Sequence, residues 1–374
     1  MLKKLSIGFV RRGYSQTGGA EAYLKRLARG VVEAGHDVQL ITTDEWPQTE
    51  WPFGAICPLH HGSVIAFAEA VKQIRPRLRC DVLMSLERIW NCDVYRAGDG
   101  LHRAWLARRR KFEIPLERFI RGFGRKHRDI LRLEEALFAN RGARRVIVSS
   151  QMVGSEIVNL YGYPADRIEM VRNGVSLSQF CFDSKLREKS RDQLKVKPGE
   201  IVLLFAGSGW ERKGLRFAIA AVALCQNRKM RLIVAGRGNQ RYYKSKRVRF
   251  LGEVTDLVPI YSAADVFILP TIYDPFSNAC LEALACGLPV ITTRDNGFSE
   301  IIEDGVNGSI VDQAHDVADL RDAIQFWSDS KRRAAARATN IQRAAQFDIS
   351  ASVLRTLEIL TQAAASAEST SGKI

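Results

Sequence analysis

The sequence predicts an α/β protein of two domains, each a parallel sheet covered by helices. The chain has 374 residues, which is more than a single domain of usual size holds. Short β-branched runs alternate with amphipathic helical segments along its whole length, as in parallel sheets with helices on both faces. The pattern reaches a hinge-like Asn173-Gly174 and begins again at residue 201, so we expect a boundary after residue 172.

The first domain opens with an apolar strand and an amphipathic helix. In the segment 18–35 the apolar residues recur at helical spacing and Gly35 ends the helix. The strands expected after it are short apolar runs bounded by polar residues. Expected strands are 5–10, 36–43, 81–86, 92–98, 145–150 and 167–175, and expected helices are 18–35, 63–75, 130–142 and a segment that reaches Tyr161.

The second domain repeats this order. Expected strands are 201–207, 231–236, 248–253, 265–270, 289–293 and 301–311, and expected helices are 215–226, 257–264, 274–287, 316–328, 331–345 and 348–363. Residues 364–374 are small and polar, which predicts a disordered tail.

Composition limits the classes of protein that fit. Seven cysteines without a C-x-x-C pair indicate neither a disulfide framework nor a zinc site and favour a reducing cytoplasm. The opening MLKKLSIGFV is interpreted as a strand rather than a signal peptide because Arg11, Arg12 and Gly13 interrupt it. No apolar run approaches the length of a transmembrane helix. The net charge of +15 indicates an anionic partner: nucleic acid, membrane or a phosphate-bearing substrate.

Two carboxylates flank a predicted helix start in the second domain. Asp274 and Glu282 stand eight residues apart around Ser277, which can cap the helix. That start follows a strand, so it lies at the sheet edge where open α/β folds bind ligands. Free amides there suit a diphosphate, and acids on both sides suit a ligand with hydroxyls at both ends, a nucleotide sugar. The alternative is an acid stabilising the helix dipole and an ordinary surface glutamate.

Cations and glycines mark two other strand-to-helix loops. Arg212-Lys213-Gly214 opens the helix after strand 201–207, where a planar fork and a point charge can clamp a diphosphate. The alternative is a solvated basic turn. Gly18 and Gly19 precede the first helix, where glycine lets backbone amides approach an anion.

These three motifs, in this order and spacing, resemble the GT-B retaining glycosyltransferases of family 4, over nearly the whole chain. The family pattern is a glycine pair, an R-K-G and an E-x7-E around a helix start. Asp274 is one methylene shorter than the family's glutamate, and Ser277 replaces the usual glycine. The resemblance implies two Rossmann-like domains facing a cleft: an acceptor-binding domain over 1–172, with helix 348–363 packed back on it, and a nucleotide-sugar-binding domain over 173–347.

The resemblance also implies roles for single residues. Arg212 and Lys213 would hold the diphosphate and stabilise its leaving charge, while Asp274 would hydrogen-bond the transferred sugar. Asn278 and Ala279 would offer backbone amides to the phosphates, Glu282 would bind the ribose, and Gly18 and Gly19 would approach donor phosphate or acceptor. The base would lie near Gly236-Arg237 and Glu253-Val254. Family members need no divalent metal, and the chain has no D-x-D motif, so we expect neither metal nor cofactor.

Residues 92–105, CDVYRAGDGLHRAW, resemble the matching part of the lipopolysaccharide core glucosyltransferases. The resemblance implies that Asp99 is an acid near the reacting sugar, with His102 a secondary candidate. The alternatives are a turn aspartate before Gly100 and a partly buried loop histidine.

The window 103–132 holds 11 basic and 3 acidic residues among aromatic and aliphatic ones. Cations beside an apolar face suit adsorption to anionic lipid. The predicted membrane-facing residues are Arg108, Arg109, Arg110, Lys111, Phe119 and Arg121. A solvated charge run over core residues is the alternative, and nucleic acid is disfavoured because no recognised binding motif is present.

The sequence thus predicts a cytoplasmic enzyme, peripheral on the inner face of the cell membrane, that transfers a hexose with retention. The expected donor is a nucleotide diphosphate sugar, UDP-glucose, and the expected acceptor is a lipid-anchored glycan such as the lipopolysaccharide core. A transferase for another surface polysaccharide or glycolipid, a non-catalytic scaffold that binds a nucleotide sugar at the membrane, a nucleotide-sugar epimerase and a nucleic-acid binder are the alternatives.

Overall fold

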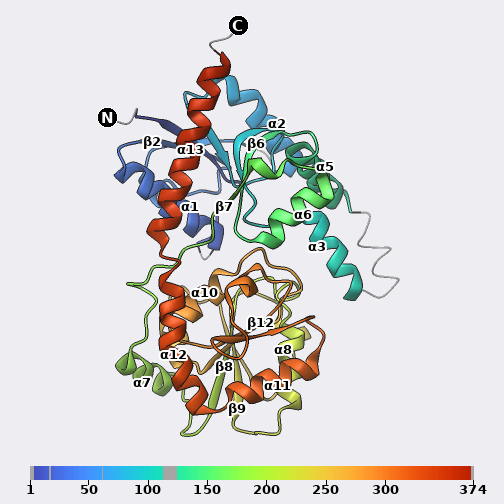
Figure 1. The fold of residues 1–374 in the computed structure, drawn as a ribbon, viewed down its shortest axis with the longest axis vertical. Coiled ribbons are helices and arrows are strands. Elements are labelled where there is room, and N and C mark those ends of the chain that lie inside the picture. The colour runs from blue at the N-terminus through green and yellow to red at the C-terminus, as the bar shows by residue number, and fades with distance from the viewer. Residues whose placement is uncertain (1–3, 17, 61, 113–123, 372–374) are drawn as a thin grey trace. The chain divides into compact units, whose positions relative to one another are not determined.

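The computed structural model describes residues 4–16, 18–60, 62–112 and 124–371, which fold into two compact units (Figure 1). Unit 1 comprises Met1–Arg172 and Ser350–Ile374, and unit 2 comprises Asn173–Ile349. Each unit contains one sheet, and every strand pair in both sheets is parallel. The predicted α/β fold class is confirmed.

Unit 1 has a seven-stranded sheet in the order β3-β2-β1-β4-β5-β6-β7. Its strands are β1 (Ser6–Val10), β2 (Asp37–Thr42), β3 (Ala55–Pro58), β4 (Val82–Ser85), β5 (Cys92–Arg96), β6 (Ala143–Val148) and β7 (Ile168–Met170). Its helices are α1 (Gly19–Glu33), α2 (Val64–Ile74), α3 (His102–Arg109), α5 (Arg125–Phe138), α6 (Gln151–Tyr161) and most of α13 (Ile349–Ser371). Short 3-10 turns cover Gln48–Glu50, Arg75–Arg77, Arg110–Phe112 and Ala165–Arg167.

Unit 2 has a six-stranded sheet in the order β10-β9-β8-β11-β12-β13. Its strands are β8 (Ile201–Ala206), β9 (Met230–Ala235), β10 (Val248–Gly252), β11 (Val266–Leu269), β12 (Val290–Thr293) and β13 (Gly308–Val311). Its helices are α7 (Ser184–Gln193), α8 (Leu215–Leu224), α9 (Val258–Ala263), α10 (Asn278–Ala285), α11 (Val317–Trp327) and α12 (Ser330–Ala345). Short 3-10 turns cover Gln240–Tyr242 and Gly297–Ile301.

The central strands are apolar on both faces because helices cover both sides of each sheet. All four residues of β11 are fully buried, as are Leu203, Leu204 and Phe205 of β8. Such continuous apolar runs are typical of parallel strands, and they explain why the sequence pattern identified these strands. Amphipathic α1 supplies the complementary face, with Leu24, Leu27 and Val31 fully buried.

Helix α13 packs against α1 within unit 1. The Tyr23 and Thr356 hydroxyls lie 3.3 Å apart, and a side chain at Gly30 would overlap Val353. Arg355 adds an ion pair to Glu169 at 3.0 Å. Because α13 continues to Ser371 and buries Ala363 and Ala364, the helix end expected at residue 363 is too early. The spacing also gave no prediction for β3, α3 or α7.

Candidate active site

The site in unit 2 lies where the strand order of its sheet reverses. The chain passes outward from β8 through β9 to β10, then crosses to β11 on the other side of β8. The loops after β8 and β11 therefore meet at one edge of the sheet, which is the usual ligand position in open α/β folds. These loops and the start of α10 carry the predicted residues Arg212, Lys213, Asp274, Asn278, Ala279 and Glu282.

Backbone contacts hold the two loops together. The Arg212 carbonyl accepts hydrogen bonds from Ile272 N at 2.8 Å and Thr271 Oγ1 at 2.9 Å. Gly214 has a φ of +74°, and a Cβ there would lie 1.8 Å from the Pro270 carbonyl oxygen. Only glycine permits this approach of the two backbones, so Gly214 helps to place Arg212 and Lys213.

Lys213 and Asp274 form an ion pair across this junction. Their Nζ and Oδ2 atoms lie 3.0 Å apart, and the side chains are only 14% and 7% exposed. Gly207 makes room for Lys213, since a Cβ there would lie 2.8 Å from the lysine Cδ. The half-buried side chain of Arg212 has no hydrogen-bond or ion-pair partner among the described residues. The junction thus presents one paired and one unpaired cation.

The start of α10 is open to a ligand. Ser277 occupies the N-cap position but its side chain makes no capping hydrogen bond, so the predicted Ser277 cap is wrong. The backbone amides of Asn278 and Ala279 lie in the first turn of the helix, so no carbonyl of a preceding turn accepts their hydrogen bonds. No other acceptor for them lies within the described ranges. Asn173 Nδ2 binds the Asn278 side-chain oxygen at 2.7 Å and leaves that backbone amide free. The amides and the helix dipole favour an anion here.

Glu282 lies one turn into α10 and is held by a buried tyrosine. The Tyr261 hydroxyl donates to Glu282 Oε2 at 2.9 Å. Tyr261 is fully buried, and burial followed by the charge of Glu282 raises the pKa of its phenol well above the ordinary value. The tyrosine therefore stays a donor and fixes one oxygen of a half-buried carboxylate. Tyr261 was not singled out in the sequence because nothing local distinguishes it from a core aromatic.

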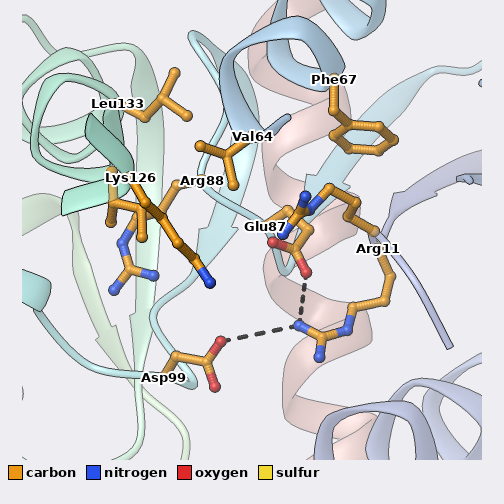
Figure 2. Close-up of a pocket in the computed structure, with 10 residues that line it drawn as sticks. Arg11, Val64, Phe67, Glu87, Arg88, Asp99, Lys126 and Leu133 are labelled. Carbon is orange, nitrogen blue, oxygen red and sulfur yellow. Dashed lines mark hydrogen bonds and ion pairs between the residues drawn. The ribbon is translucent and has the colours of Figure 1, made fainter. Parts of the chain in front are cut away.

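A second concave site, of about 270 Å³, lies in unit 1 where its own strand order reverses between β1 and β4 (Figure 2). Loops after β1, β4 and β5 contribute its arginines and carboxylates, and α2 and α5 contribute apolar side chains and one lysine. The lining residues are Arg11, Arg12, Val64, Phe67, Glu87, Arg88, Asp99, Lys126, Ile130 and Leu133.

Arg11 is the centre of the charges on the β1 side of this pocket. Its guanidinium lies 2.9 Å from Glu21, 2.7 Å from Glu87 and 3.9 Å from Asp99. Burial alone would lower the pKa of Arg11, but these carboxylates outweigh it and raise that pKa. Burial raises the pKa of Glu87, and Arg11 opposes this shift.

Arg88 is bound on the other side of the pocket. Its Nε lies 3.1 Å from Glu134 and its NH2 donates to the Gly100 carbonyl at 2.6 Å. Glu134 is fully buried and also accepts the His102 and Arg103 amides, so it caps α3 from within α5. Arg11 and Arg88 are thus both held by carboxylates, and they form fixed parts of the pocket wall.

Among the unit 1 candidates, Asp99 is accessible to a ligand, and local packing explains the glycine at position 18. The Asp99 side chain is 52% exposed and faces the pocket. Gly18 leaves room for the Glu21 carboxylate, because a Cβ at Gly18 would lie 1.8 Å from its oxygen and the glutamate side chain would have to move. Gly19 begins α1. Asp99, Gly18 and Gly19 belong to unit 1, whereas the candidates for binding the diphosphate, the sugar and the ribose belong to unit 2: Arg212, Lys213, Asp274, Asn278, Ala279 and Glu282.

His102 is engaged in the structure rather than free for acid–base work. Its Nε2 lies 2.9 Å from His127 Nδ1, with the rings stacked at 5.0 Å. Burial, together with the charge of Arg88, lowers the pKa of His102 to about 4. A neutral imidazole that links α3 to α5 fits a structural role.

Only some of the basic residues in the window 103–132 are exposed and could contact a membrane surface. Arg110 and Lys111 are exposed, whereas Arg108 pairs with Glu156 at 2.7 Å and Arg109 is half-buried. Phe119 and Arg121 lie outside the described residues. Over the described part of the chain, no helix is both long and apolar enough to cross a bilayer.

Within the same ranges, no three His, Cys, Asp or Glu side chains gather as a metal site would require. The segments named for the nucleotide base lie at carboxyl ends of strands: Gly236-Arg237 follows β9, and Glu253-Val254 follows β10.

Comparison with solved structures identifies the fold class of the protein. WaaG, a glycosyltransferase involved in lipopolysaccharide biosynthesis, superposes with a TM-score of 0.81, covering 95% of this chain and 99% of WaaG at 20% identity. Anabaena Alr3699/HepE, solved with UDP and glucose, gives a TM-score of 0.73 and covers 96% and 100% at 20% identity. The protein therefore has the GT-B fold.

Sequence comparison gives the family. A model described as Glycosyltransferase Family 4 matches residues 17–179, and one described as Glycosyl transferases group 1 matches residues 200–329. The D-inositol 3-phosphate glycosyltransferase of Pseudarthrobacter chlorophenolicus is 30% identical over 88% of both chains. The chain belongs to glycosyltransferase family 4 and is a retaining glycosyltransferase.

Proposed function

We propose that this enzyme transfers glucose from UDP-glucose, and that the unit 2 site binds the donor. The observation that carries the donor site is the convergence of Arg212, Lys213 and the free amides of α10 at the strand-order reversal. Three independent sources of positive charge on neighbouring loops at one edge of the sheet suit a diphosphate. The presence of UDP and glucose in the Alr3699/HepE structure supports the choice of nucleotide and sugar.

In this proposal each residue acts on a different part of the donor. Arg212 and Lys213 neutralise the diphosphate as it leaves, and the Asn278 and Ala279 amides bind its oxygens. Asp274 holds Lys213 in place and accepts a hydrogen bond from the sugar. Glu282, oriented by Tyr261, accepts hydrogen bonds from the ribose hydroxyls.

The reaction proposed is front-face displacement. The acceptor hydroxyl oxygen forms a bond to the anomeric carbon as the bond from that carbon to the phosphate oxygen breaks. The departing phosphate takes the proton of the acceptor hydroxyl, so UDP and the glycoside are the products. This route retains the configuration and needs no side chain as general base.

For the acceptor we propose a lipid-anchored glycan of the lipopolysaccharide-core kind, bound in unit 1 with Asp99 near the reacting hydroxyl. The fold shared with WaaG supports this choice. The enzyme would then work in the cytoplasm at the inner face of the cell membrane, with the exposed Arg110 and Lys111 attracted to anionic lipid. Another surface polysaccharide or glycolipid is the alternative acceptor of the same class.

A second candidate acceptor is a phosphorylated cyclitol. It is favoured by the D-inositol 3-phosphate glycosyltransferase that shares 30% identity with this chain. A membrane scaffold that binds nucleotide sugars without turnover is the alternative of a different class. Assaying UDP release from several sugar donors with each kind of acceptor separates these functions.

The proposal predicts that Lys213→Ala lowers turnover of UDP-glucose by about 10²-fold, because one preorganised charge on the leaving group is lost. Transfer kinetics with a responsive acceptor measure this, and thermal unfolding shows whether the variant is folded. Lys229→Ala, an exposed lysine of the same unit, is the control and is expected to match the wild type. A loss below threefold in Lys213→Ala would remove Lys213 from catalysis.

A further inference from the structure

We propose that unit 2 has its own surface for an anionic lipid membrane, on the loop between β9 and β10. The surface consists of Arg241, Tyr242, Lys244 and Lys246, and we call it the basic loop. The inference rests on the proposed function for its membrane, since a lipid-anchored acceptor requires one. It adds a second membrane contact to the one proposed for unit 1, and it does not depend on the donor site.

The basic loop lies in a long segment without acidic residues. Residues 212–252 contain 12 lysines and arginines and no aspartate or glutamate. The whole chain has a net charge of +15, and this segment contributes +12 of it. The window 103–132 is less one-sided, with 11 basic and 3 acidic residues. Cations gathered without acids between them give a positive surface potential that attracts an anionic partner.

The cations of the basic loop are exposed and uncommitted. Arg241, Lys244 and Lys246 are all exposed, and no side-chain hydrogen bond or ion pair holds any of them within the described part of the chain. Other cations of the segment are bound: Arg231 lies 2.6 Å from Glu200, for example. The exposed Arg237 is not counted in the surface, because the donor's base is expected beside it.

Anchored neighbours make the outward direction of Tyr242 a property of the folded loop. Tyr243 packs edge-on against the buried Trp210, with ring centroids 5.5 Å apart. Before it, the Asn239 side chain accepts the Arg241 amide at 3.1 Å and caps the short turn that contains Tyr242. Tyr242 itself is 80% exposed, more than any other large apolar side chain within the described ranges.

The far end of the loop brings a second exposed apolar side chain. Arg247 donates to the Val222 carbonyl at 2.7 Å and to the Cys225 carbonyl at 2.9 Å, which fixes this end of the loop to the end of α8. Leu224 lies between these two acceptors in the chain and is 53% exposed. The surface around the loop therefore combines cations with a tyrosine and a leucine.

This combination fits lipid better than another polyanion. Lysine and arginine are attracted to the phosphates of anionic lipid, and tyrosine is typical of the headgroup level, where its ring lies in an apolar and its hydroxyl in a polar layer. A nucleic acid would stack its bases on several aromatic side chains. The basic loop exposes one tyrosine, and a nearby leucine adds nothing to stacking.

The test is flotation of the full chain with phosphatidylcholine vesicles, with and without phosphatidylglycerol. One variant carries Arg241→Gln, Lys244→Gln and Lys246→Gln together, and a second carries Tyr242→Ser. The control variant carries Lys185→Gln, Lys189→Gln and Lys331→Gln, which remove the same charge from exposed positions of α7 and α12. The salt concentration is about 0.1 M, where charges more than about 10 Å from the lipid are screened.

We expect the loop triple variant to lose about 10²-fold in affinity for phosphatidylglycerol vesicles, or roughly fivefold for each cation removed. Tyr242→Ser should lose about fivefold, because the interfacial ring is gone. The control triple should stay within twofold of the wild type, and all proteins should bind phosphatidylcholine alone only weakly. Thermal unfolding shows whether each variant is folded.

Three outcomes would overturn the proposal: vesicle binding of the loop triple within twofold of the wild type, an equal loss in the control triple, or no binding of the wild type. Calorimetry with UDP and retention on duplex DNA, both without lipid, identify another ligand. A variant that lost only UDP affinity would assign these cations to the donor, and one that lost only DNA binding would assign them to nucleic acid. UDP that bound to none of the proteins would count against the donor site alone.

Discussion

At the scale of single residues, two charged groups of the proposed donor site, Lys213 and Glu282, are each held by a contact with another side chain. Lys213 rests on Asp274 at 3.0 Å, so its charge is kept in place before a diphosphate arrives. Glu282 rests on Tyr261, which uses one carboxylate oxygen. Preorganised groups of this kind need little rearrangement when the substrate binds, and this is how fixed charges assist a reaction.

The Tyr261 contact makes a prediction about donor binding. Tyr261→Phe is expected to raise the KM for UDP-glucose about tenfold with little change in kcat, because Glu282 loses the donor that orients it. A donor without ribose hydroxyls should show the same KM with both proteins. Steady-state kinetics with the two donors measure this difference.

The control for this experiment is Tyr163→Phe, a buried tyrosine of unit 1 whose hydroxyl donates to the Ala143 carbonyl at 2.9 Å. If Tyr261→Phe raised the KM equally for the donor lacking ribose hydroxyls, the effect would be a general loss of packing and Tyr261 would not be a positioning residue.

Residue types at the unit 2 site were predictable from sequence, whereas their partners were not. Asp274, Lys213 and Glu282 were singled out by spacing near strand ends. Tyr261 and Lys126 were not, because each looks like its neighbours: an aromatic in an apolar helix and one cation in a basic run. Which cation of residues 103–132 lines a pocket depends on how α5 packs against α2, and local sequence does not contain that information.

At the scale of elements, short backbone contacts between loops position the site more than the helices do. The loop after β8 is fixed to the loop after β11 through the Arg212 carbonyl and through the close approach of Gly214 to Pro270. The sequence predicted the central strands β1, β4, β8 and β11 and helix α10 because apolar runs are continuous there, but it missed β3 and began the last strand too early, at residue 301 instead of Gly308. It missed α7, whose residues are nearly all polar and whose start is capped by Asp183.

Two glycines of one loop allow this contact to be tested. Gly209 and Gly214 have φ values of +73° and +74°, but a Cβ at Gly209 meets nothing within 4 Å. Gly209→Ala should lose about 1–2 kcal/mol of unfolding free energy from the left-handed backbone alone. Gly214→Ala should lose more and also lower turnover, because Pro270 must move and Lys213 with it.

Denaturant unfolding and transfer kinetics on both variants measure these effects. Equal losses of stability, with turnover unchanged in both, would show that the approach of Gly214 to Pro270 does not position the cations.

At the scale of the whole molecule, the two units share the same architecture. Each has a parallel sheet whose strand order reverses once, and each gathers charged side chains at that reversal. Alternation of strands and helices was enough to predict the two sheets. The unit 1 pocket was not predictable, because Arg11, Glu87, Asp99 and Lys126 come from four separate segments of the chain.

Unit 2 also contains a buried charge cluster that makes its stability depend on pH. Asp265 is 7% exposed, with Arg187 at 2.6 Å, Arg191 at 3.0 Å and the Val202 amide at 2.8 Å. Burial opposes ionisation, but Arg187, the Val202 amide and Arg191 outweigh it and lower the pKa of Asp265. A lowered carboxyl pKa stabilises the fold above the ordinary aspartate pKa of about 3.9, and this contribution is lost as the pH falls below it.

Asp265→Asn should therefore lose about 3–5 kcal/mol of unfolding free energy at pH 7, because the arginines lose their buried counter-charge. The difference from the wild type should narrow at pH 3. Asp312→Asn, at an exposed pair with Arg294, is the control and should change stability by less than about 1 kcal/mol. A gap for Asp265→Asn that is the same at both pH values would contradict this account.

The central claim is that unit 2 binds the diphosphate of the donor between Arg212, Lys213 and the start of α10. A crystal structure of the protein with UDP tests it most directly. We expect phosphate oxygens within hydrogen-bond distance of Lys213 Nζ and the Ala279 amide, and ribose hydroxyls on Glu282. UDP bound away from these groups, or a site left empty at saturating UDP, would contradict the claim.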